Sequence, residues 1–213
     1  MAALINSLKV QNILPVFKAA PLLKKLLILI FFTGISASVV QADDLEKLIQ
    51  QCGMCHGQDG NSPSSTIPSL AGVTLDYFKH TLDAYKNDGR KSELMKSFVH
   101  TLNEHQINEI GSYFNKQTFK PRDQQFDSAK AEKGKALHNK YCEKCHENEG
   151  RITDNNYGIL AGQWMPYLTQ ALKDYLDGKR RAPPMMITKL KALKQDAGDD
   201  GIEQVVNYYA SVK

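Results

Sequence analysis

Two copies of one short motif combine residue types that can hold a metal-containing cofactor. Residues 52–56 read Cys-Gly-Met-Cys-His, and residues 142–146 read Cys-Glu-Lys-Cys-His. In this pattern two thiols add across the vinyl groups of a haem, and the adjacent histidine becomes a ligand of the iron. The sequence therefore predicts two covalently bound haem c groups, attached through Cys52, Cys55, Cys142 and Cys145, with His56 and His146 as iron ligands.

Two other uses of paired cysteines fit the sequence less well. All four cysteines lie in the two motifs, so none remains for a disulfide framework or a catalytic thiol. A zinc ribbon usually places its cysteine pairs about 15–20 residues apart, whereas 86 residues separate Cys55 from Cys142. A thioredoxin-like redox pair would need a βαβ context, and neither motif is flanked by Val- and Ile-rich strands.

The ligand on the opposite face of each iron decides between electron carriage and reactions with oxygen or peroxide. Met95 lies seven residues before Leu102, and Met186 lies seven residues before Leu193. A thioether is a soft ligand that stabilises ferrous iron and raises the reduction potential. The shared spacing predicts that Met95 and Met186 complete the coordination of the two irons.

Other side chains remain candidates for the second iron ligand at each site. Met185 lies at a strict 90-residue offset from Met95, but the register changes nearby, because Gly89 and Gly178 differ by 89. The leucine spacing favours Met186 over its neighbour. Four further histidines do not recur in the other half, which is more typical of surface or helix-start positions, and these are His80, His100, His105 and His138.

Pro68 distinguishes the two proximal histidines. It precedes the repeated Leu-Ala-Gly segment, where its carbonyl could accept a hydrogen bond from the free N–H of His56 and fix the ring orientation. The equivalent position of the second half is Gly158. We therefore expect the two histidines to be held differently and the two haems to differ in reduction potential.

An internal repeat shows how these residues are organised. The second motif follows the first by 90 residues, as do several other matched positions: Leu70-Ala71-Gly72 with Leu160-Ala161-Gly162, Tyr77 with Tyr167, Leu82 with Leu172, Tyr85 with Tyr175, and Arg90 with Arg180. The repeat predicts an all-α fold of two tandem class I cytochrome c domains, residues 43–119 and 128–213, joined by a polar linker at 120–127. Each core is small, and a haem would supply its apolar centre.

Helices must position the motifs within each domain. Apolar periodicity and capping residues predict three per half. The expected helices are residues 43–51, a helix capped by Thr74 and stopped at Gly89, and 103–115 in the first half; and 128–141 with Ser128 as its cap, a helix with Pro166 in its first turn and Gly178 as its stop, and 201–212 in the second half.

Residues 1–42 have the pattern of a secretory signal. They contain four lysines and no acidic residue, and Lys24-Lys25 precede an apolar run at 26–32 that leads to small residues ending at Ala42. A retained membrane anchor is the alternative, but this run is short of the roughly 20 apolar residues that a span needs. We predict cleavage after Ala42, a periplasmic location and no membrane span in the mature form.

Charge argues against nucleic-acid binding. Of the 27 basic residues of the chain four lie in the predicted signal, so 23 remain against 23 acidic ones. The mature protein is formally neutral, and haem propionates would make it acidic. The basic character of the full sequence belongs largely to the cleaved segment, so no nucleic-acid partner is expected.

The double motif, the repeated Leu-Ala-Gly and the spaced methionines resemble the dihaem class I cytochromes c. Two subfamilies are similar: the free periplasmic carrier of the cytochrome c4 type, and the dihaem subunit of flavocytochrome c sulfide dehydrogenase. The second resembles this chain more closely, in residues 140–146, 157–168 and 208–211 and in the insertion at 194–200. The methionine of that family stands where Met186 does, whereas Pro68 is a feature of the carrier type.

The resemblance implies a heterodimer in which an FAD-containing flavoprotein oxidises sulfide. This chain would accept the electrons and pass them to a soluble cytochrome c, without catalysis of its own. The alternatives are a free periplasmic carrier that serves a terminal oxidase and a dihaem peroxidase, which would need one haem without a methionine ligand.

Overall fold

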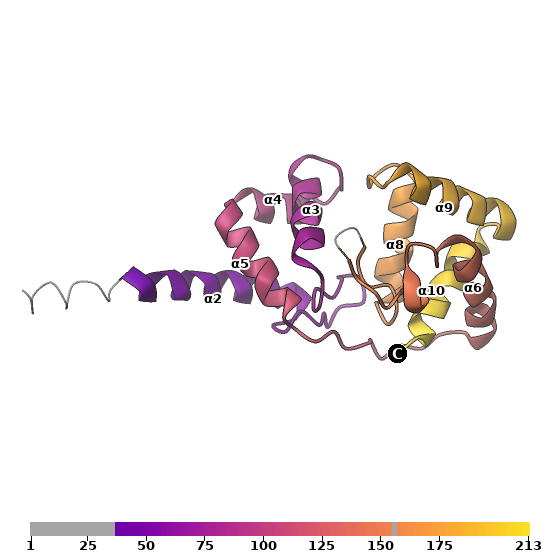
Figure 1. Ribbon diagram of the computed structural model, residues 1–213, viewed down its shortest axis with the longest axis horizontal. Coiled ribbons are helices and arrows are strands. Elements are labelled where there is room, and N and C mark those ends of the chain that lie inside the picture. The colour runs from indigo at the N-terminus through magenta and orange to yellow at the C-terminus, as the bar shows by residue number, and fades with distance from the viewer. Residues whose placement is uncertain (1–36, 155–156) are drawn as a thin grey trace, which may run out of the picture. The chain divides into compact units, whose positions relative to one another are not determined.

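The computed structural model describes residues 37–154 and 157–213, with side chains from Asp44 onward across the same gap. Regular structure in these ranges is helical (Figure 1), and their β pairing is limited to an antiparallel bridge between Arg90 and Arg180. The predicted all-α fold is confirmed. The predicted signal peptide lies outside the described residues except for positions 37–42. Residues 43–213 form one compact unit, so the expected domain boundary at 120–127 stays a prediction.

Four helices serve the first half, which we define as residues 43–119. They are α2 (Ala37–His56), α3 (Leu75–Lys86), α4 (Glu93–His100) and α5 (Glu104–Asn115). The buried face of α3 carries Phe78, Leu82 and Tyr85, as the 3.6-residue spacing of its apolar positions predicts. These side chains share a core with Val99 of α4 and with residues of α5, and this core fixes α4 beside the first motif.

The second half, residues 128–213, repeats this plan. Its helices are α6 (Ser128–Tyr141), α7 (Glu147–Gly150), α8 (Met165–Leu176), α9 (Pro184–Ala197) and α10 (Asp200–Ser211). α6 packs against α10 at very short range. A Cβ atom added to Gly134 of α6 would lie 2.0 Å from the backbone oxygen of Gln204, so this helix contact requires a glycine.

The helix starts were predicted with mixed success. Thr74 caps α3 as expected, because its side chain accepts a hydrogen bond from the backbone N–H of Tyr77 at 3.2 Å. Ser128 was the wrong cap for α6. Asp127 accepts from two backbone N–H groups of the first turn, at 2.8 and 3.0 Å, and a carboxylate there also complements the positive end of the helix.

The stop of α3 corrects the register of the repeat. Asp88, with φ 53°, takes the left-handed position that Gly178, with φ 70°, takes after α8. Gly89 is therefore not the stop residue, and the offset here is still 90. The extra residue of the second half comes later, between Arg180 and the start of α9, which makes the offset 91 at the start of that helix.

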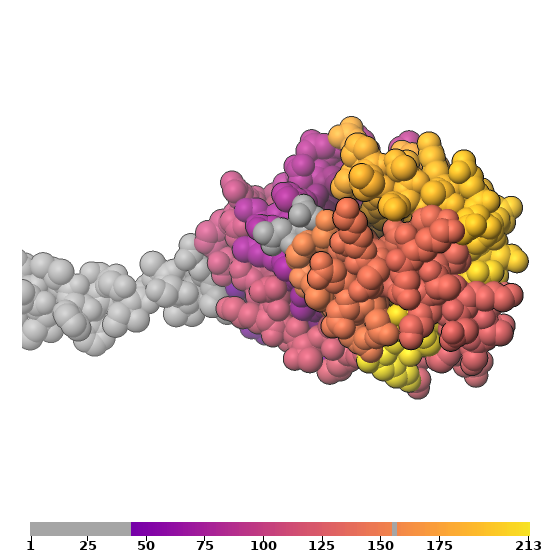
Figure 2. Space-filling view, turned by 45° about the vertical axis from the view of Figure 1, so that its right-hand side comes forward, coloured from indigo at the N-terminus to yellow at the C-terminus, as the bar shows by residue number. Residues whose placement is uncertain are grey.

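The two halves meet directly along a shared boundary (Figure 2). The backbone N–H of Tyr167 donates to the Ser65 carbonyl at 3.1 Å, and the indole Nε1 of Trp164 donates to the Ser62 carbonyl at 3.0 Å. Residues 163–167 of the second half thus hold residues 62–69 of the first, the loop that follows the first motif.

Candidate haem sites

The first motif forms the last turns of α2. His56 is buried, and its Nδ1 lies 2.8 Å from the carbonyl oxygen of Pro68, which confirms the predicted contact. Burial lowers the pKa of His56 despite this hydrogen bond. The imidazole is therefore neutral at neutral pH, the form that binds a metal, and the Pro68 contact orients Nδ1–H away from the metal-binding nitrogen.

The second motif follows α6 in a series of turns. The N–H of Cys142 donates to His138 O at 2.7 Å, and the N–H of His146 donates to Cys142 O at 2.9 Å. The His146 ring packs edge-on against Tyr157, and its buried Nδ1 has no hydrogen-bond partner among the described residues. Burial lowers the pKa of His146 to about 4, so this imidazole is neutral as well.

The half-buried thiols of Cys52 and Cys142 differ from those of a reactive redox pair. Burial raises the pKa of Cys52 to about 11 and that of Cys142 to about 11. Reactive cysteines have a lowered pKa because the thiolate is the nucleophile. The electrostatics of both motifs therefore disfavour the thioredoxin-like alternative.

A cavity of about 370 Å³ brings the predicted residues of the second site together. Cys142, Cys145, His146 and Met186 all line it, together with apolar side chains of α8, α9 and α10. Attachment thiols, a neutral imidazole and a thioether around one largely apolar cavity form the donor set of a haem c. The residues present therefore fit the group.

The register of the two methionine helices differs from a strict 90-residue offset. Met95 is the third residue of α4, and Met186 is the third residue of α9. Met185 corresponds instead to Leu94, and these two side chains are 62% and 60% exposed. Met95 and Met186 are both half-buried. Although Met185 also borders the cavity, the helix register pairs Met95 with Met186.

The remaining histidines differ in their surroundings. His80, His100 and His105 are exposed, and His80 lies at the rim of the second cavity. The surface interpretation is wrong for His138, which is 0% exposed. It faces inward because α6 packs against α10, and its ring contacts the Tyr209 hydroxyl at 3.0 Å and the Glu143 carboxylate. His138 braces the second motif from within the helix before it.

Sequence reasoning found the matched arginines and tyrosines but not their role. Arg90 Nη2 donates to the Tyr167 hydroxyl at 3.1 Å, and Arg180 Nη2 donates to the Tyr77 hydroxyl at 3.2 Å. Each arginine thus reaches a tyrosine of the other half, and each also lies over a tyrosine ring of its own half. We call this set the arginine–tyrosine cluster: Arg90, Arg180, Tyr77, Tyr85, Tyr167 and Tyr175.

The cluster holds an excess of positive charge. Within the described residues neither arginine has a carboxylate at ion-pair distance, although Arg180 is buried. Burial alone would raise the pKa of Tyr167, but the two guanidinium groups outweigh it and lower the pKa to about 8. Both arginines line the cavity of the second predicted haem site, so this cavity is electropositive where the two halves meet.

Comparison with known proteins places the chain among cytochromes. Residues 41–114 match the family model described as cytochrome c oxidase, cbb3-type, subunit III. Cytochrome c4 of Pseudomonas aeruginosa is 30% identical over 169 residues, which covers 75% of this chain and 83% of the relative. The chain belongs to the cytochrome c4 family. Like other cytochrome c4 proteins, it is a dihaem c-type cytochrome with two covalently bound haems, and it transfers electrons.

Two further similarities bear on the subfamily. The crystal structure of reduced cytochrome c4 from Pseudomonas stutzeri superposes with a TM-score of 0.68 at 25% identity, covering 81% of this chain and 98% of that one. The predicted tandem cytochrome c domains are thereby confirmed. The cytochrome subunit of sulfide dehydrogenase from Chlorobaculum tepidum is 39% identical, but over only 69 residues and 32% of this chain. The family resemblance to cytochrome c4 is thus the more extensive one.

The helices add one observation about membranes. None of those in the described part of the chain combines the length and the apolar character needed to cross a bilayer.

Proposed function

We propose that this cytochrome c4 is a periplasmic electron carrier in which each domain holds one six-coordinate haem. His56 and Met95 ligate the first iron, and His146 and Met186 the second. Cys52, Cys55, Cys142 and Cys145 carry the thioether links. The observation that carries this proposal is the shared position of the two methionines, each third in the helix that follows the arginine of its half.

A bound haem supplies a one-electron iron couple, and the protein sets its conditions. The neutral imidazoles and the thioethers would both ligate a bound haem iron, which would favour electron transfer over reaction with oxygen or peroxide. The Pro68 carbonyl orients His56. Arg90 and Arg180 fit the carboxylates of haem propionates, since they are charged groups of the cavity without carboxylate partners in the described ranges.

The extent of the similarity favours a free carrier that delivers electrons to a terminal oxidase. The relationship to cytochrome c4 covers 75% of this chain, whereas the relationship to the sulfide dehydrogenase subunit covers 32% of it. Transient electron-transfer encounters tend to bury less than about 1,200 Å² in total. A free carrier would therefore dock weakly with donor and acceptor and purify alone.

The second candidate is the haem subunit of a sulfide-oxidising flavocytochrome c. The 39% identity over 69 residues with a sulfide dehydrogenase cytochrome subunit favours it locally. In that role the chain would form a heterodimer with an FAD-containing flavoprotein and pass electrons to a soluble cytochrome c. A lasting interface of this kind would exceed the area of a transient encounter.

Two measurements on native protein test these proposals. Intact mass should show two haem additions after loss of residues 1–42, and one addition or none would overturn the dihaem proposal. Size-exclusion chromatography monitored at haem and flavin wavelengths separates the two roles. We expect a haem protein that elutes without flavin at moderate salt, and co-elution with a flavoprotein would favour the flavocytochrome instead.

A further inference from the structure

Gln163 of the second half forms hydrogen bonds with the main chain of the first half, in the loop that follows the first motif. Its side chain is 3% exposed, and its amide bonds both backbone groups of Ser69. The Ser69 N–H donates to Gln163 Oε1 at 3.1 Å, and Gln163 Nε2 donates to the Ser69 carbonyl at 3.2 Å. Ser69 itself is buried, so water does not replace these bonds if they are lost.

One planar peptide group connects Gln163 to His56. The N–H of Ser69 and the carbonyl of Pro68 belong to the same peptide unit, which is held flat by resonance. His56 Nδ1 donates to that carbonyl at 2.8 Å, while Gln163 accepts from the N–H. A peptide unit that donates strongly at its N–H becomes a better acceptor at its oxygen, because hydrogen bonds in a chain polarise one another. Gln163 therefore both positions and strengthens the contact with His56.

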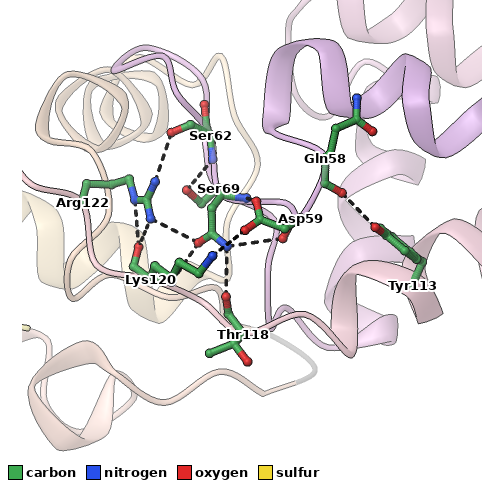
Figure 3. Close-up of polar contacts among 9 residues, drawn as sticks. Gln58, Asp59, Ser62, Ser69, Tyr113, Thr118, Lys120 and Arg122 are labelled. Carbon is green, nitrogen blue, oxygen red and sulfur yellow. Dashed lines mark hydrogen bonds and ion pairs between the residues drawn. The ribbon is translucent and has the colours of Figure 1, made fainter.

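Other contacts hold the same loop without touching this peptide unit. The N–H of Ser62 donates to Ser69 Oγ at 3.0 Å, and Arg122 from the linker reaches the Ser62 carbonyl at 3.5 Å (Figure 3). Trp164 Nε1 donates to the same carbonyl at 3.0 Å. The loop thus stays attached to the second half and to the linker when Gln163 alone is changed.

The second half has no reciprocal arrangement. At the 90-residue offset Gln163 corresponds to Val73, a buried side chain that cannot form hydrogen bonds, and Pro68 corresponds to Gly158. His146 Nδ1 finds no hydrogen-bond partner in the part of the chain that the structure describes. The influence therefore runs in one direction, from the second domain to the first proximal histidine.

We propose that Gln163 is a positioning residue for the first haem, through which the second domain sets the reduction potential of the first. The proposal rests on the proposed function, in which His56 ligates the first iron. A stronger hydrogen bond from Nδ1–H makes the imidazole a more basic ligand. A more basic ligand stabilises ferric iron relative to ferrous iron, so Gln163 lowers the potential of the first haem.

The test compares three variants of the full-length holoprotein. Gln163→Met keeps the volume of the side chain but removes both hydrogen bonds to Ser69. Gln163→Glu restores a donor and an acceptor when its carboxyl group is protonated, and only an acceptor when it is ionised. Trp164→Phe is the matched control, because it removes another hydrogen bond across the same boundary without touching the Pro68–Ser69 peptide.

The readouts are the potential of each haem from a spectroelectrochemical titration and the paramagnetically shifted haem methyl resonances, which report the orientation of the axial imidazole. Met95→Ala identifies the signals of the first haem by removing its proposed ligand. In Gln163→Met we expect the potential of the first haem to rise and its methyl pattern to change, with the second haem unmoved. In Gln163→Glu the shift relative to wild type should shrink as the pH falls, and if Gln163→Met does not fold this comparison stands alone.

The outcomes separate the inference from the proposed function. A wild-type protein with fewer than two low-spin haems would overturn the proposed function itself. Given two low-spin haems, an unchanged first haem in the Gln163 variants would overturn the role of Gln163. An equal shift in Trp164→Phe would also overturn it, because the effect would then come from loosening the boundary and not from the Pro68–Ser69 peptide.

Discussion

In the first half the ring N–H of His56 meets the Pro68 carbonyl 2.8 Å away, whereas in the second half the buried Nδ1 of His146 has no hydrogen-bond partner among the described residues. Each histidine ends the same motif; His56 is buried, and His146 is half-buried with its Nδ1 buried. The residue at the equivalent position of the following loop is Pro68 in the first half and Gly158 in the second. Identical attachment chemistry is thus compatible with two electronically different haem environments.

The two predicted haem sites are more alike on the side that carries the methionine. Met95 and Met186 take the same position in α4 and α9, so as the proposed iron ligands they should contribute similarly to both potentials. We therefore expect the first haem to have the lower potential and the second haem the higher one, because the hydrogen-bonded imidazole is the more basic ligand. An electron that enters at the first haem would then move downhill to the second.

Removal of a methionine ligand should have the largest effect on this comparison. Met95→Ala and Met186→Ala should each abolish about half of the ferric methionine–iron absorption at the red edge of the spectrum and create one high-spin haem. Met185→Ala is the control, because the equivalent residue Leu94 is equally exposed on α4. Optical and paramagnetic resonance spectra of the ferric proteins measure the result. Loss of the absorption band in Met185→Ala but not in Met186→Ala would show that Met185 is the ligand.

Overpacking α6 against α10 should destabilise the second half selectively. In Gly134→Ala the new Cβ would meet the Gln204 carbonyl oxygen at 2.0 Å, and backbone shifts of this kind cost about 1–3 kcal/mol. Thermal unfolding followed separately at the two haem methionine signals should show the second signal lost at the lower temperature. Lys135→Ala, an exposed neighbour on the same helix, should leave both transitions in place. Equal loss of both signals in Gly134→Ala would mean that the halves unfold as one unit.

The sequence predicted the parts of each site that depend on local spacing. The motifs, the methionine-to-leucine distance and the Pro68 carbonyl all act within a short stretch of chain, so one sequence contains their full pattern. The extra residue of the second half was predicted too early in the chain. Glycine is the usual residue at a left-handed helix stop, so the stop of α3 was assigned to Gly89, but Asp88 adopts that conformation.

Features built between distant segments were not predictable in this way. Gln163 contacts a backbone 94 residues earlier, and the arginines of the arginine–tyrosine cluster reach hydroxyls 77 and 103 residues away. His138 was assigned to a surface or helix-start position because it does not recur in the other half, and only the packing of α6 on α10 shows that it is buried. Tertiary packing determines the burial and the contacts of such residues, and the periodicity of the sequence contains no information about that packing.

Making the first half resemble the second at one residue should narrow the gap between the haems. Pro68→Gly keeps the carbonyl that accepts from His56 but frees the backbone that presents it. If the hydrogen bond loses about 0.5–1 kcal/mol of its preference for ferric iron, the first potential should rise by roughly 20–40 mV for a one-electron couple. A spectroelectrochemical titration measures both potentials. The second haem of the same variant is the internal control, and a larger shift of its potential would contradict the assignment of the asymmetry to His56.

The smallest expected effect concerns how each half secures the segment after its motif. Asp59 of the first half pairs with Lys120 at 2.9 Å, near the start of the linker, whereas its counterpart Glu149 pairs with Arg151 only two residues away. The hydrogen bond from Lys120 lowers the pKa of Asp59 to about 2. This carboxylate therefore contributes stability that is complete above its unfolded pKa, near 4, and is lost as the pH falls toward 2.

Asp59→Asn should remove that contribution, but the pair is exposed, so the loss at neutral pH should be only about 0.2–1 kcal/mol. Denaturant unfolding at pH 7 and at pH 2.5 measures it, and the difference between variant and wild type should shrink at the lower pH. Glu149→Gln should cost less, because its ion pair spans two residues and closes almost no loop, whereas the Asp59–Lys120 pair ties the linker to the first half across 61 residues. An equal cost for both variants would mean that the linker is secured by its backbone contacts alone, chiefly through the 2.8 Å bond from the Lys120 N–H to Asn61.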